Sequence, residues 1–215
     1  AENGCKSIFV LEKAGSATGS TGMAHDIFGA ESPVQKRLGI EASRDELFKT
    51  AMEWAHWTNI NPRIVRAFID KSGDTIGWLE QKGLSFEMIQ YYPNQVPLVR
   101  HSVKGHGHAL MKTLRDNCQE LGVNILTHTP GKKILRDAQG RISGVLAESK
   151  EGEITISTEC VIVATGGYGN NKEMLKKYWP NYNENYTYDG PPSNTGDGII
   201  MATEIGAATA GMGAL

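Results

Sequence analysis

The stretch ECVIVATGGYG, residues 159–169, decides the fold class of this 215-residue chain. Its residues 160–164 form a short, uninterrupted apolar run, the pattern expected of a strand buried on both faces of a parallel sheet. Gly166, Gly167 and Gly169 then remove the side chains that would keep another molecule away from the backbone. The stretch therefore predicts a central strand whose carboxyl end contacts a ligand. The glycines alone would fit a tight turn equally well.

The overall composition, 40% apolar and 21% charged, is that of an ordinary globular protein of one or two domains. The net charge of −2 gives no electrostatic reason to expect nucleic acid or an anionic membrane surface as a partner. No apolar stretch approaches the length of about 18 residues that a membrane span needs. The three cysteines are far apart and fit reduced, structural thiols better than disulfides or a zinc site.

A second strand is expected at residues 7–12, SIFVLE, and it ends in the acid Glu12. An acid at the end of the second strand of a dinucleotide-binding fold binds a ribose hydroxyl, roughly 20 residues after a GxGxxG loop. Only eleven residues precede Glu12, so we expect that loop upstream, in a longer protein of which this sequence is a fragment. Taken alone, a glutamate at a strand end is more often a solvated surface residue.

The loop GSATGSTG, residues 15–22, is dense in small residues and hydroxyls. This composition suits backbone N–H groups that lie along a phosphate or a polar ring, and it suits a flexible turn equally well. No lysine follows in the spacing of a nucleotide-triphosphate loop.

Between residues 31 and 85 the apolar residues recur at the spacing expected of helices. A capping box at residues 43–46 begins one helix, Asn61 and Pro62 begin another, and residues 76–79 begin a third. Three tryptophans of this region are expected in the helical core and not around a ligand: Trp54, Trp57 and Trp78.

Residues 91–104 read as an irregular loop that leads into GHGHAL, residues 105–110. We reject this segment as a dinucleotide fingerprint, because Leu110 replaces the third glycine and no apolar strand precedes it. His101, His106 and His108 have a spacing that could suit a metal, but no carboxylate or cysteine stands near them. A helix that ends at Gly122 and a strand at residues 123–126 are the better interpretation.

Three runs of strand character between residues 132 and 157 predict an antiparallel meander. After the central strand come a helix at residues 173–179 and a turn-rich loop. TGDG, residues 195–198, then opens a helix that runs to about residue 205. A glycine-rich helix start can present N–H donors to an anionic or carbonyl oxygen, although such a tetrapeptide alone is more often just a cap.

In this order the segments resemble the flavoprotein subunit family of fumarate reductase and succinate dehydrogenase over nearly the whole chain. The most specific motifs are VLEK (10–13), GHAL (107–110), VATGGYG (163–169) and TGDG (195–198) followed by Met201 and Ala202. The resemblance implies an α/β fold: a truncated FAD-binding, Rossmann-like parallel sheet with an antiparallel β-meander and a helical insertion. Residues 1–30 and 105–215 would form the incomplete sheet domain, and residues 31–104 the insertion.

The resemblance also implies FAD as the cofactor. Glu12 would bind the adenosine ribose, the backbone after Pro130 would lie near adenine, and Asp197 would hold the ribityl or pyrophosphate region. The full cofactor-binding set expected from it is Glu12, Lys13, Gly19, Ser20, Thr21, Gly22, Lys132, Ala164, Thr165, Gly166, Gly167, Thr195, Gly196 and Asp197.

The chain departs from the family pattern in two ways. The loop after Lys13 is short, and no histidine stands where membrane-bound members attach flavin covalently, since His25 comes too late; non-covalent FAD is therefore expected. The family's acid/base arginine and substrate-binding histidines lie downstream of the TGDG motif. No catalytic residue and no metal ligand is therefore expected within this chain.

The leading functional hypothesis is an oxidoreductase that transfers hydride between flavin and an activated carbon–carbon bond, as fumarate reductase does. The alternatives are a steroid or enone dehydrogenase of the same superfamily, or a folded remnant that binds no cofactor. An NAD-dependent dehydrogenase is disfavoured because no GxGxxG is present.

The expected partner is a small carboxylate or conjugated alkene, and the redox partner is unknown. Without the upstream loop, the fragment is expected to bind FAD weakly or not at all and to be inactive. The sheet edge bared beside residues 7–11 is expected to be covered by a rearranged segment or by a second copy of the chain. A cytoplasmic location is the default expectation, because a targeting signal would lie outside these residues.

Overall fold

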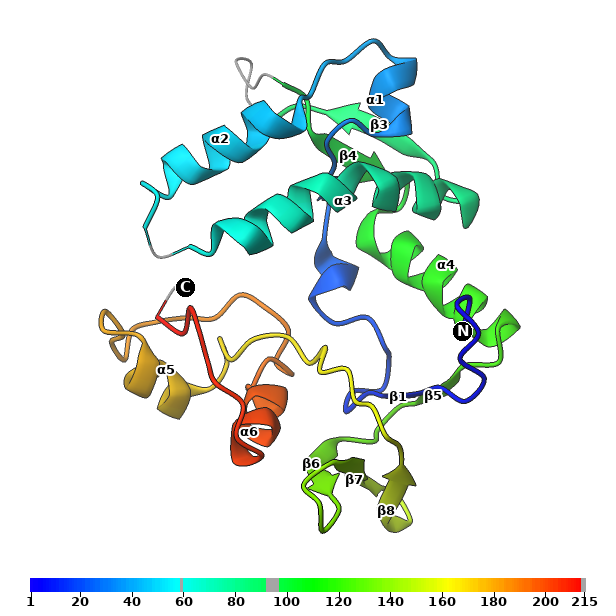
Figure 1. Cartoon of the computed structure of the whole chain (residues 1–215), viewed down its shortest axis with the longest axis vertical. Helices are drawn as coiled ribbons and strands as arrows, with labels where there is room; N and C mark the ends of the chain where they lie inside the picture. Colours follow the sequence, from blue (N-terminus) through cyan, green and yellow to red (C-terminus); the bar gives the residue numbers. More distant parts are fainter. Residues whose placement is uncertain (59, 92–96, 214–215) are drawn as a thin grey trace. The chain divides into compact units, whose positions relative to one another are not determined.

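The computed structural model describes residues 1–58, 60–91 and 97–213. The chain divides into two compact units, Ala1–Ser20 with Cys118–Leu215, and Thr21–Asn117, and each is described by itself (Figure 1). The expected division at residues 30/31 and 104/105 stays a prediction. No helix in the described residues is long and apolar enough to cross a membrane.

The first unit contains the expected pair of parallel strands. Strand β1 (Phe9–Leu11) lies beside β5 (Asn124–Leu126), with Val10 opposite Ile125. The N–H of Glu12 donates to the carbonyl of Leu126 at 2.9 Å and extends the pairing by one residue. The strands expected at residues 7–12 and 123–126 are thus confirmed, and they lie side by side and parallel over three residue pairs.

The prediction of a buried central strand at residues 160–164 is wrong for this structure. The segment is not a strand, and the side chain of Ile162 is 88% exposed. A β-branched apolar run forms a strand only where neighbouring backbones accept its hydrogen bonds, and none of the described strands pairs with this one. Cys5 and Cys160 are exposed as well, so neither packs as a structural core thiol.

The meander prediction is confirmed. Strands β6 (Gly131–Arg136), β7 (Ile142–Ser149) and β8 (Gly152–Ser157) pair antiparallel in that order. Helix α6 (Asp197–Glu204) packs against β6, where the methyl group of Met201 would lie 3.6 Å from a Cβ placed at Gly131. The meander therefore supports the middle of α6 through Met201.

An aromatic cluster holds the rest of the first unit together. Its buried members are Tyr168, Met174 and Leu175, and tyrosines and a tryptophan pack around them. Helix α5 (Lys172–Tyr178) begins inside this cluster, because the side chain of Asn171 accepts the N–H of Met174 at 3.0 Å. The residues between the ATGGYG and TGDG motifs are thus anchored by apolar packing.

The second unit is built on a small sheet that the sequence did not predict. Strand β4 (Arg100–Val103) lies between β2 (Asp26–Phe28) and β3 (Phe86–Ile89), and both neighbours are antiparallel to it. Part of this sheet falls in the expected irregular loop, so that assignment is wrong for residues 100–103. The run RHSV is polar in composition, yet its alternate residues His101 and Val103 are buried.

Four helices accompany this sheet. They are α1 (Pro33–Arg37), α2 (Arg44–Trp54), α3 (Pro62–Gln81) and α4 (His106–Glu120), and α3 contacts both α1 and α2 (Figure 1). Ser43 caps α2 and Asn61 caps α3 as expected. The third helix expected at residues 76–79 is not separate, because these residues are the last part of α3, which runs unbroken from Pro62 to Gln81.

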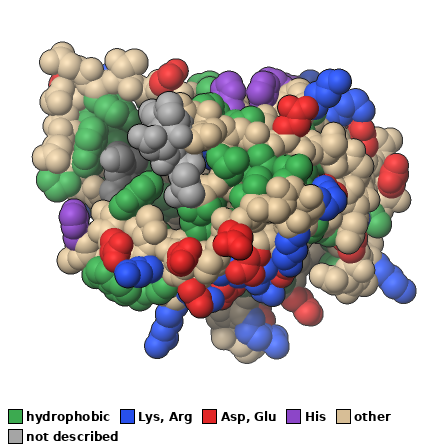
Figure 2. All heavy atoms as spheres, turned by 90° about the horizontal axis from the view of Figure 1, so that it is seen from above, with side chains coloured by type: hydrophobic (Ala, Val, Ile, Leu, Met, Phe, Trp, Pro, Cys, Tyr) green, Lys and Arg blue, Asp and Glu red, His purple; other side chains and the backbone are tan. Residues whose placement is uncertain are grey.

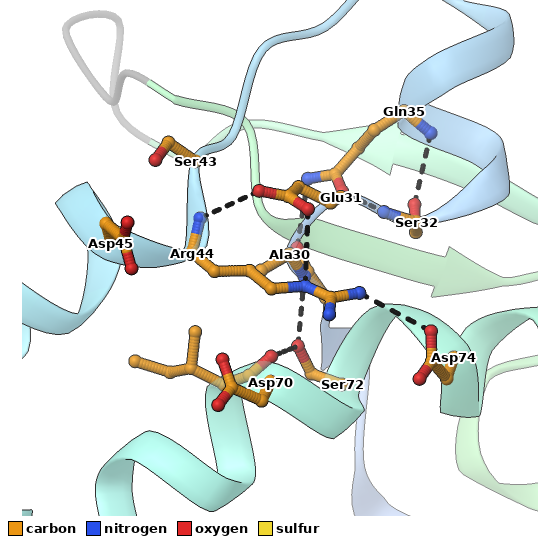
Figure 3. Close-up of polar contacts among 12 residues, drawn as sticks. Ala30, Glu31, Ser32, Gln35, Ser43, Arg44, Asp45, Asp70, Ser72 and Asp74 are labelled. Carbon is orange, nitrogen blue, oxygen red and sulfur yellow. Dashed lines mark hydrogen bonds and ion pairs between the residues drawn. The ribbon is translucent and has the colours of Figure 1, made fainter.

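Polar contacts tie α2 and α3 to the loop before α1 (Figure 3). The N–H of Ala30 donates to the hydroxyl of Ser72 at 3.0 Å, and the guanidinium of Arg44 lies 3.4 Å from carboxylate oxygens of both Glu31 and Asp74. Glu31 also accepts the N–H of Arg44 at 3.2 Å. These contacts hold α3 against the loop. The backbone of the loop lies so close to Gly73 that a side chain would not fit there.

The expectation that the tryptophans pack in the helical core is wrong. Trp54 is 83% exposed, Trp57 59% and Trp78 39%. The residue of α2 that faces the core is Met52, and a residue two positions later points to the opposite side of a helix. Hydrophobic side chains accordingly reach the surface beside charged ones (Figure 2).

Candidate functional site

The two glycine-rich motifs of the first unit meet side by side. The N–H of Gly196 donates to the carbonyl of Gly167 at 3.0 Å, and the N–H of Gly198 donates to the hydroxyl of Thr165 at 3.2 Å. Asn171 adds a side-chain bond to the carbonyl of Thr195 at 2.8 Å. ATGGYG and TGDG therefore form one structural element, although Thr195 lies 26 positions after Gly169.

Several glycines of this element have a structural reason to lack a side chain, but Gly167 has none within the described residues. Gly166 and Gly196 have φ angles of +75° and +78°, which residues with a Cβ rarely adopt. A Cβ on Gly198 would overlap the side chains of Thr165 and Val163. At Gly167 nothing lies within 4 Å of a Cβ position, so no neighbour within the described residues requires a glycine there.

Lys13 joins the end of β1 to the start of α6. Its ammonium lies 2.6 Å from Oδ2 of Asp197 and 2.5 Å from the hydroxyl of Thr195. The Thr195 hydroxyl in turn donates to Oδ1 of Asp197 at 2.7 Å. Three predicted site residues thus form a closed triangle of charge-assisted hydrogen bonds.

This triangle sets the ionisation of Asp197. Burial by itself raises the pKa of the carboxyl, but the hydrogen bonds from Lys13 and Thr195 outweigh it, so the pKa lies below its ordinary value. The charge of Lys132 acts in the same direction from β6. Lys132 is held by Glu148 at 2.7 Å, and this bond raises the pKa of its ammonium.

Glu12 uses its side chain locally. Its Oε1 accepts the N–H of Ala14 at 2.7 Å, which folds the chain back after β1, and its carbonyl accepts the N–H of Thr129. The carboxylate is half-buried at the carboxyl end of β1, and its second oxygen is left for another donor. Its expected bond to a ribose stays a prediction.

The predicted loop residues fall in both units. Gly19 is exposed with a φ of +51°, and the hydroxyl of Ser20 accepts a bond from the side chain of Asn194 at 3.2 Å. Thr21 and Gly22 belong to the second unit, in the 3₁₀ helix η1 (Ser20–Met23), where Gly107 of α4 packs against their backbone. The structure brings Gly19 and Ser20, but not Thr21 and Gly22, into the unit that holds the two motifs.

A cavity of about 340 Å³ opens between the ATGGYG segment and α6. Ligand pockets have volumes of about 300 to 1,000 Å³. The lining is almost entirely of small residues, which leaves backbone atoms accessible: Val163, Ala164, Thr165, Gly166, Gly198, Ile199, Ala202, Thr203, Ala207, Ala208, Thr209, Ala210 and Met212.

Asn194 is a site residue that sequence reasoning missed. Its Nδ2 bonds the hydroxyls of Ser20 and Tyr188, its carbonyl accepts the N–H of Asn170, and its Oδ1 fills the space beside Gly166. The only signal in the sequence was its position directly before the TGDG motif. It links the small-residue loop to the two glycine motifs.

The histidines singled out as metal-like do not converge. His101 is fully buried in β4, whereas His106 begins α4 with its ring 5.0 Å from that of His25. Within the described residues, no three His, Cys, Asp or Glu side chains gather in a way that could hold a metal ion.

Comparisons with known proteins match the whole chain. The family model described as FAD binding domain covers residues 1–215. A vinyl phenol reductase of Lactiplantibacillus plantarum is 31% identical over 210 residues, which cover 96% of this chain and 42% of that protein. An NADH:fumarate oxidoreductase of Klebsiella pneumoniae is 28% identical, over 96% of this chain and 23% of that protein. The chain thus spans less than half the length of these relatives.

Solved structures give the same result. A flavocytochrome c3 fumarate reductase in its open conformation is similar with a TM-score of 0.83 and 26% identity, over 93% of this chain and 36% of that one. A 3-ketosteroid-Δ4-(5α)-dehydrogenase from Rhodococcus jostii RHA1 has a TM-score of 0.79 at 20% identity, over 93% and 49% of the two chains. The second likeness shows the fold alone.

Proposed function

Because the chain belongs to the FAD binding domain family, we propose that the protein of which it forms part is an oxidoreductase that transfers hydride between FAD and an activated carbon–carbon double bond. FAD is the cofactor. Relatives named as reductases of vinyl phenol, fumarate and urocanate support the reaction class. These compounds share a double bond conjugated to an electron-withdrawing or aromatic group, so the proposed substrate is a small conjugated alkene, with a carboxylate in many cases.

The joined glycine motifs are the observation that carries the proposal. Gly167 has open space where a Cβ would lie, and the cavity beside Thr165 is lined by small residues, so a flat ring system can approach the backbone. The first turn of α6 adds N–H groups and a helix N-terminus that favour carbonyl or anionic oxygens. Residues of this kind fit FAD.

In this proposal the protein's own residues bind and orient the cofactor. The flavin part of FAD would be held by Thr165, Gly166 and Gly167. Asp197 would accept hydrogen bonds from cofactor hydroxyls. Glu12 would bind the adenosine ribose, and the backbone at Lys132 would lie along adenine. The bound flavin supplies the hydride chemistry.

A steroid or enone dehydrogenase is the second candidate. Its support is the shared fold of the ketosteroid dehydrogenase, at an identity too low to carry more. Sequence relatives of higher identity carry names of the first class, which favours a small conjugated alkene over a steroid.

The experiment uses the full-length protein, purified with its flavin and reduced anaerobically. Fumarate, acrylate, urocanate, 4-vinylphenol and an α,β-unsaturated 3-ketosteroid are each added while flavin absorbance is followed. The proposal expects one or more of the first four to reoxidise the flavin, and succinate, the saturated control, to leave it reduced. Reoxidation by the ketosteroid alone would support the second candidate, and a protein without flavin would contradict both.

A further inference from the structure

Lys13 is a predicted cofactor residue whose charged group is already engaged by two neighbours in the protein. An ammonium has three N–H donors and no acceptor. Two of these donors lie within hydrogen-bond distance of Thr195 and Asp197, at 2.5 and 2.6 Å. A lysine held in this way has little left to offer a cofactor phosphate.

Asp197, in contrast, keeps acceptor capacity. A carboxylate has about four lone-pair sites, and here Oδ1 accepts one bond from Thr195 while Oδ2 accepts one from Lys13. The Asp197 side chain is 37% exposed and that of Lys13 is 27% exposed. The carboxylate can therefore receive further donors from a ligand, and its charge is balanced locally by the ammonium.

We propose that Lys13 is a positioning residue, which holds Asp197 ionised and in one orientation so that this carboxylate accepts hydrogen bonds from FAD hydroxyls, and which does not itself contact the cofactor. Thr195 completes the arrangement by fixing the second oxygen. This inference depends on FAD as the cofactor and not on the reaction proposed above.

The charges around Asp197 are the basis of the test. Lys13 and Thr195 bond it directly, and Lys132, paired with Glu148, acts on it from β6; together they keep its pKa below the ordinary value. Removing the ammonium in Lys13→Met should move the titration of the Asp197 carboxyl to higher pH, as measured by carbon NMR of the cofactor-free chain. An unchanged titration would overturn the inference, because Lys13 would then not control Asp197.

A double-mutant cycle on FAD affinity gives the second readout. Near pH 7, Lys13→Met should weaken FAD binding about tenfold, the scale expected for loss of one charge-assisted hydrogen bond. Asp197→Asn should weaken binding at least as much, and the double variant no more than Asp197→Asn alone, because Lys13 acts only through Asp197. Losses that multiply in the double variant would show an independent contact between Lys13 and FAD and would overturn the inference.

Lys133→Met provides the matched control, since Lys133 is an exposed lysine of β6. It removes the same charge, and we expect FAD affinity within about twofold of wild type, as for most surface substitutions. An equal loss in this control would assign the effect to overall charge and would overturn the positioning role. Absence of FAD binding by the full-length wild type would overturn the inference together with the cofactor, whereas failure of the alkene assay alone would contradict only the proposed reaction.

Discussion

Gly198 donates its N–H to the hydroxyl of Thr165 at 3.2 Å, across a gap too narrow for any side chain at residue 198. The contact is between the first turn of α6 and the residue that precedes the double glycine. It fixes the helix N-terminus against the ATGGYG segment, beside the cavity that Gly166 and Gly198 help to line. The geometry of the candidate site therefore depends on Gly198, which itself lines the cavity.

Gly198→Ala should destabilise the first unit. The new methyl group would overlap the side chains of Thr165 and Val163, and overpacking of this kind costs about 1 to 3 kcal/mol. Urea unfolding of the cofactor-free chain, followed by circular dichroism, measures the loss. A variant as stable as wild type would contradict the close contact.

Gly167→Ala is the complementary substitution. No atom within the described residues lies within 4 Å of the added Cβ, so the free energy of unfolding should stay within about 0.5 kcal/mol of wild type. FAD affinity should nevertheless fall, because the methyl group occupies the space through which the ring would approach. A variant that binds FAD as tightly as wild type would place the flavin elsewhere.

Glycine spacing marked both motifs of the candidate site in the sequence, and their contact with FAD stays a prediction. In the structure Gly166 and Gly196 adopt positive φ angles, and the two motifs contact each other, which the sequence did not predict. The meander, the parallel pair β1 and β5, and the caps at Ser43 and Asn61 are confirmed as well, since turn and capping signals are local. Family membership is confirmed over the full chain.

The failures have a common physical cause: partners distant in sequence. The apolar run at residues 160–164 could form a strand only beside other strands, which its own composition cannot supply. The polar strand β4 forms because β2 and β3 lie on either side of it. Trp54 was assigned to the core by its hydrophobicity, although the position of Met52 fixes which side of α2 is buried. The Lys13–Asp197 pair joins residues 184 positions apart, and no local pattern indicates it.

The two sides of α2 should respond very differently to substitution. Met52 is 1% exposed, and Met52→Ala should cost about 2 to 5 kcal/mol of stability. Trp54→Gln, two positions later on the exposed side, should change stability by about 0.5 kcal/mol or less. Chemical denaturation of both variants compares them directly. A large loss at Trp54 would show that its indole is covered by protein in solution.

His101 should make the stability of the second unit depend on pH. Burial is the main cause that lowers the pKa of its imidazole below the ordinary 6.5, and the backbone bond to Val99 offsets this only partly. Its Nε2 lies 2.7 Å from the hydroxyl of Ser32, and the edge of Phe86 packs on the ring. The folded protein thus holds a neutral imidazole that the unfolded chain protonates near pH 6.5.

The sign of this effect follows from proton linkage. Between the lowered pKa and 6.5 the unfolded state binds more protons, so the free energy of unfolding should fall as the pH drops below about 6.5. Three of the four tryptophans lie in this unit, so tryptophan fluorescence during urea unfolding reports mainly on it. His101→Gln should remove this part of the slope, whatever its effect on absolute stability. An identical slope in the variant would assign the pH dependence to other groups.

Gly107 of α4 offers a last test, in which helix propensity and packing oppose each other. Gly to Ala inside a helix normally stabilises by about 1 kcal/mol. Here the new methyl group would overlap the carbonyl oxygen of Thr21 and lie 2.8 Å from the carbonyl carbon of Gly22, and these backbone atoms cannot rotate away as a side chain could. The N–H of Gly107 also donates to the carbonyl of Ala24 at 2.8 Å, which fixes the helix start against η1.

Gly107→Ala should therefore destabilise the second unit by about 1 to 3 kcal/mol, the cost of overpacking. His108→Ala, at the exposed next position, should be neutral or slightly stabilising, because only propensity acts there. If Gly107→Ala were instead the more stable of the two variants, the close packing of α4 on η1 would not exist in solution.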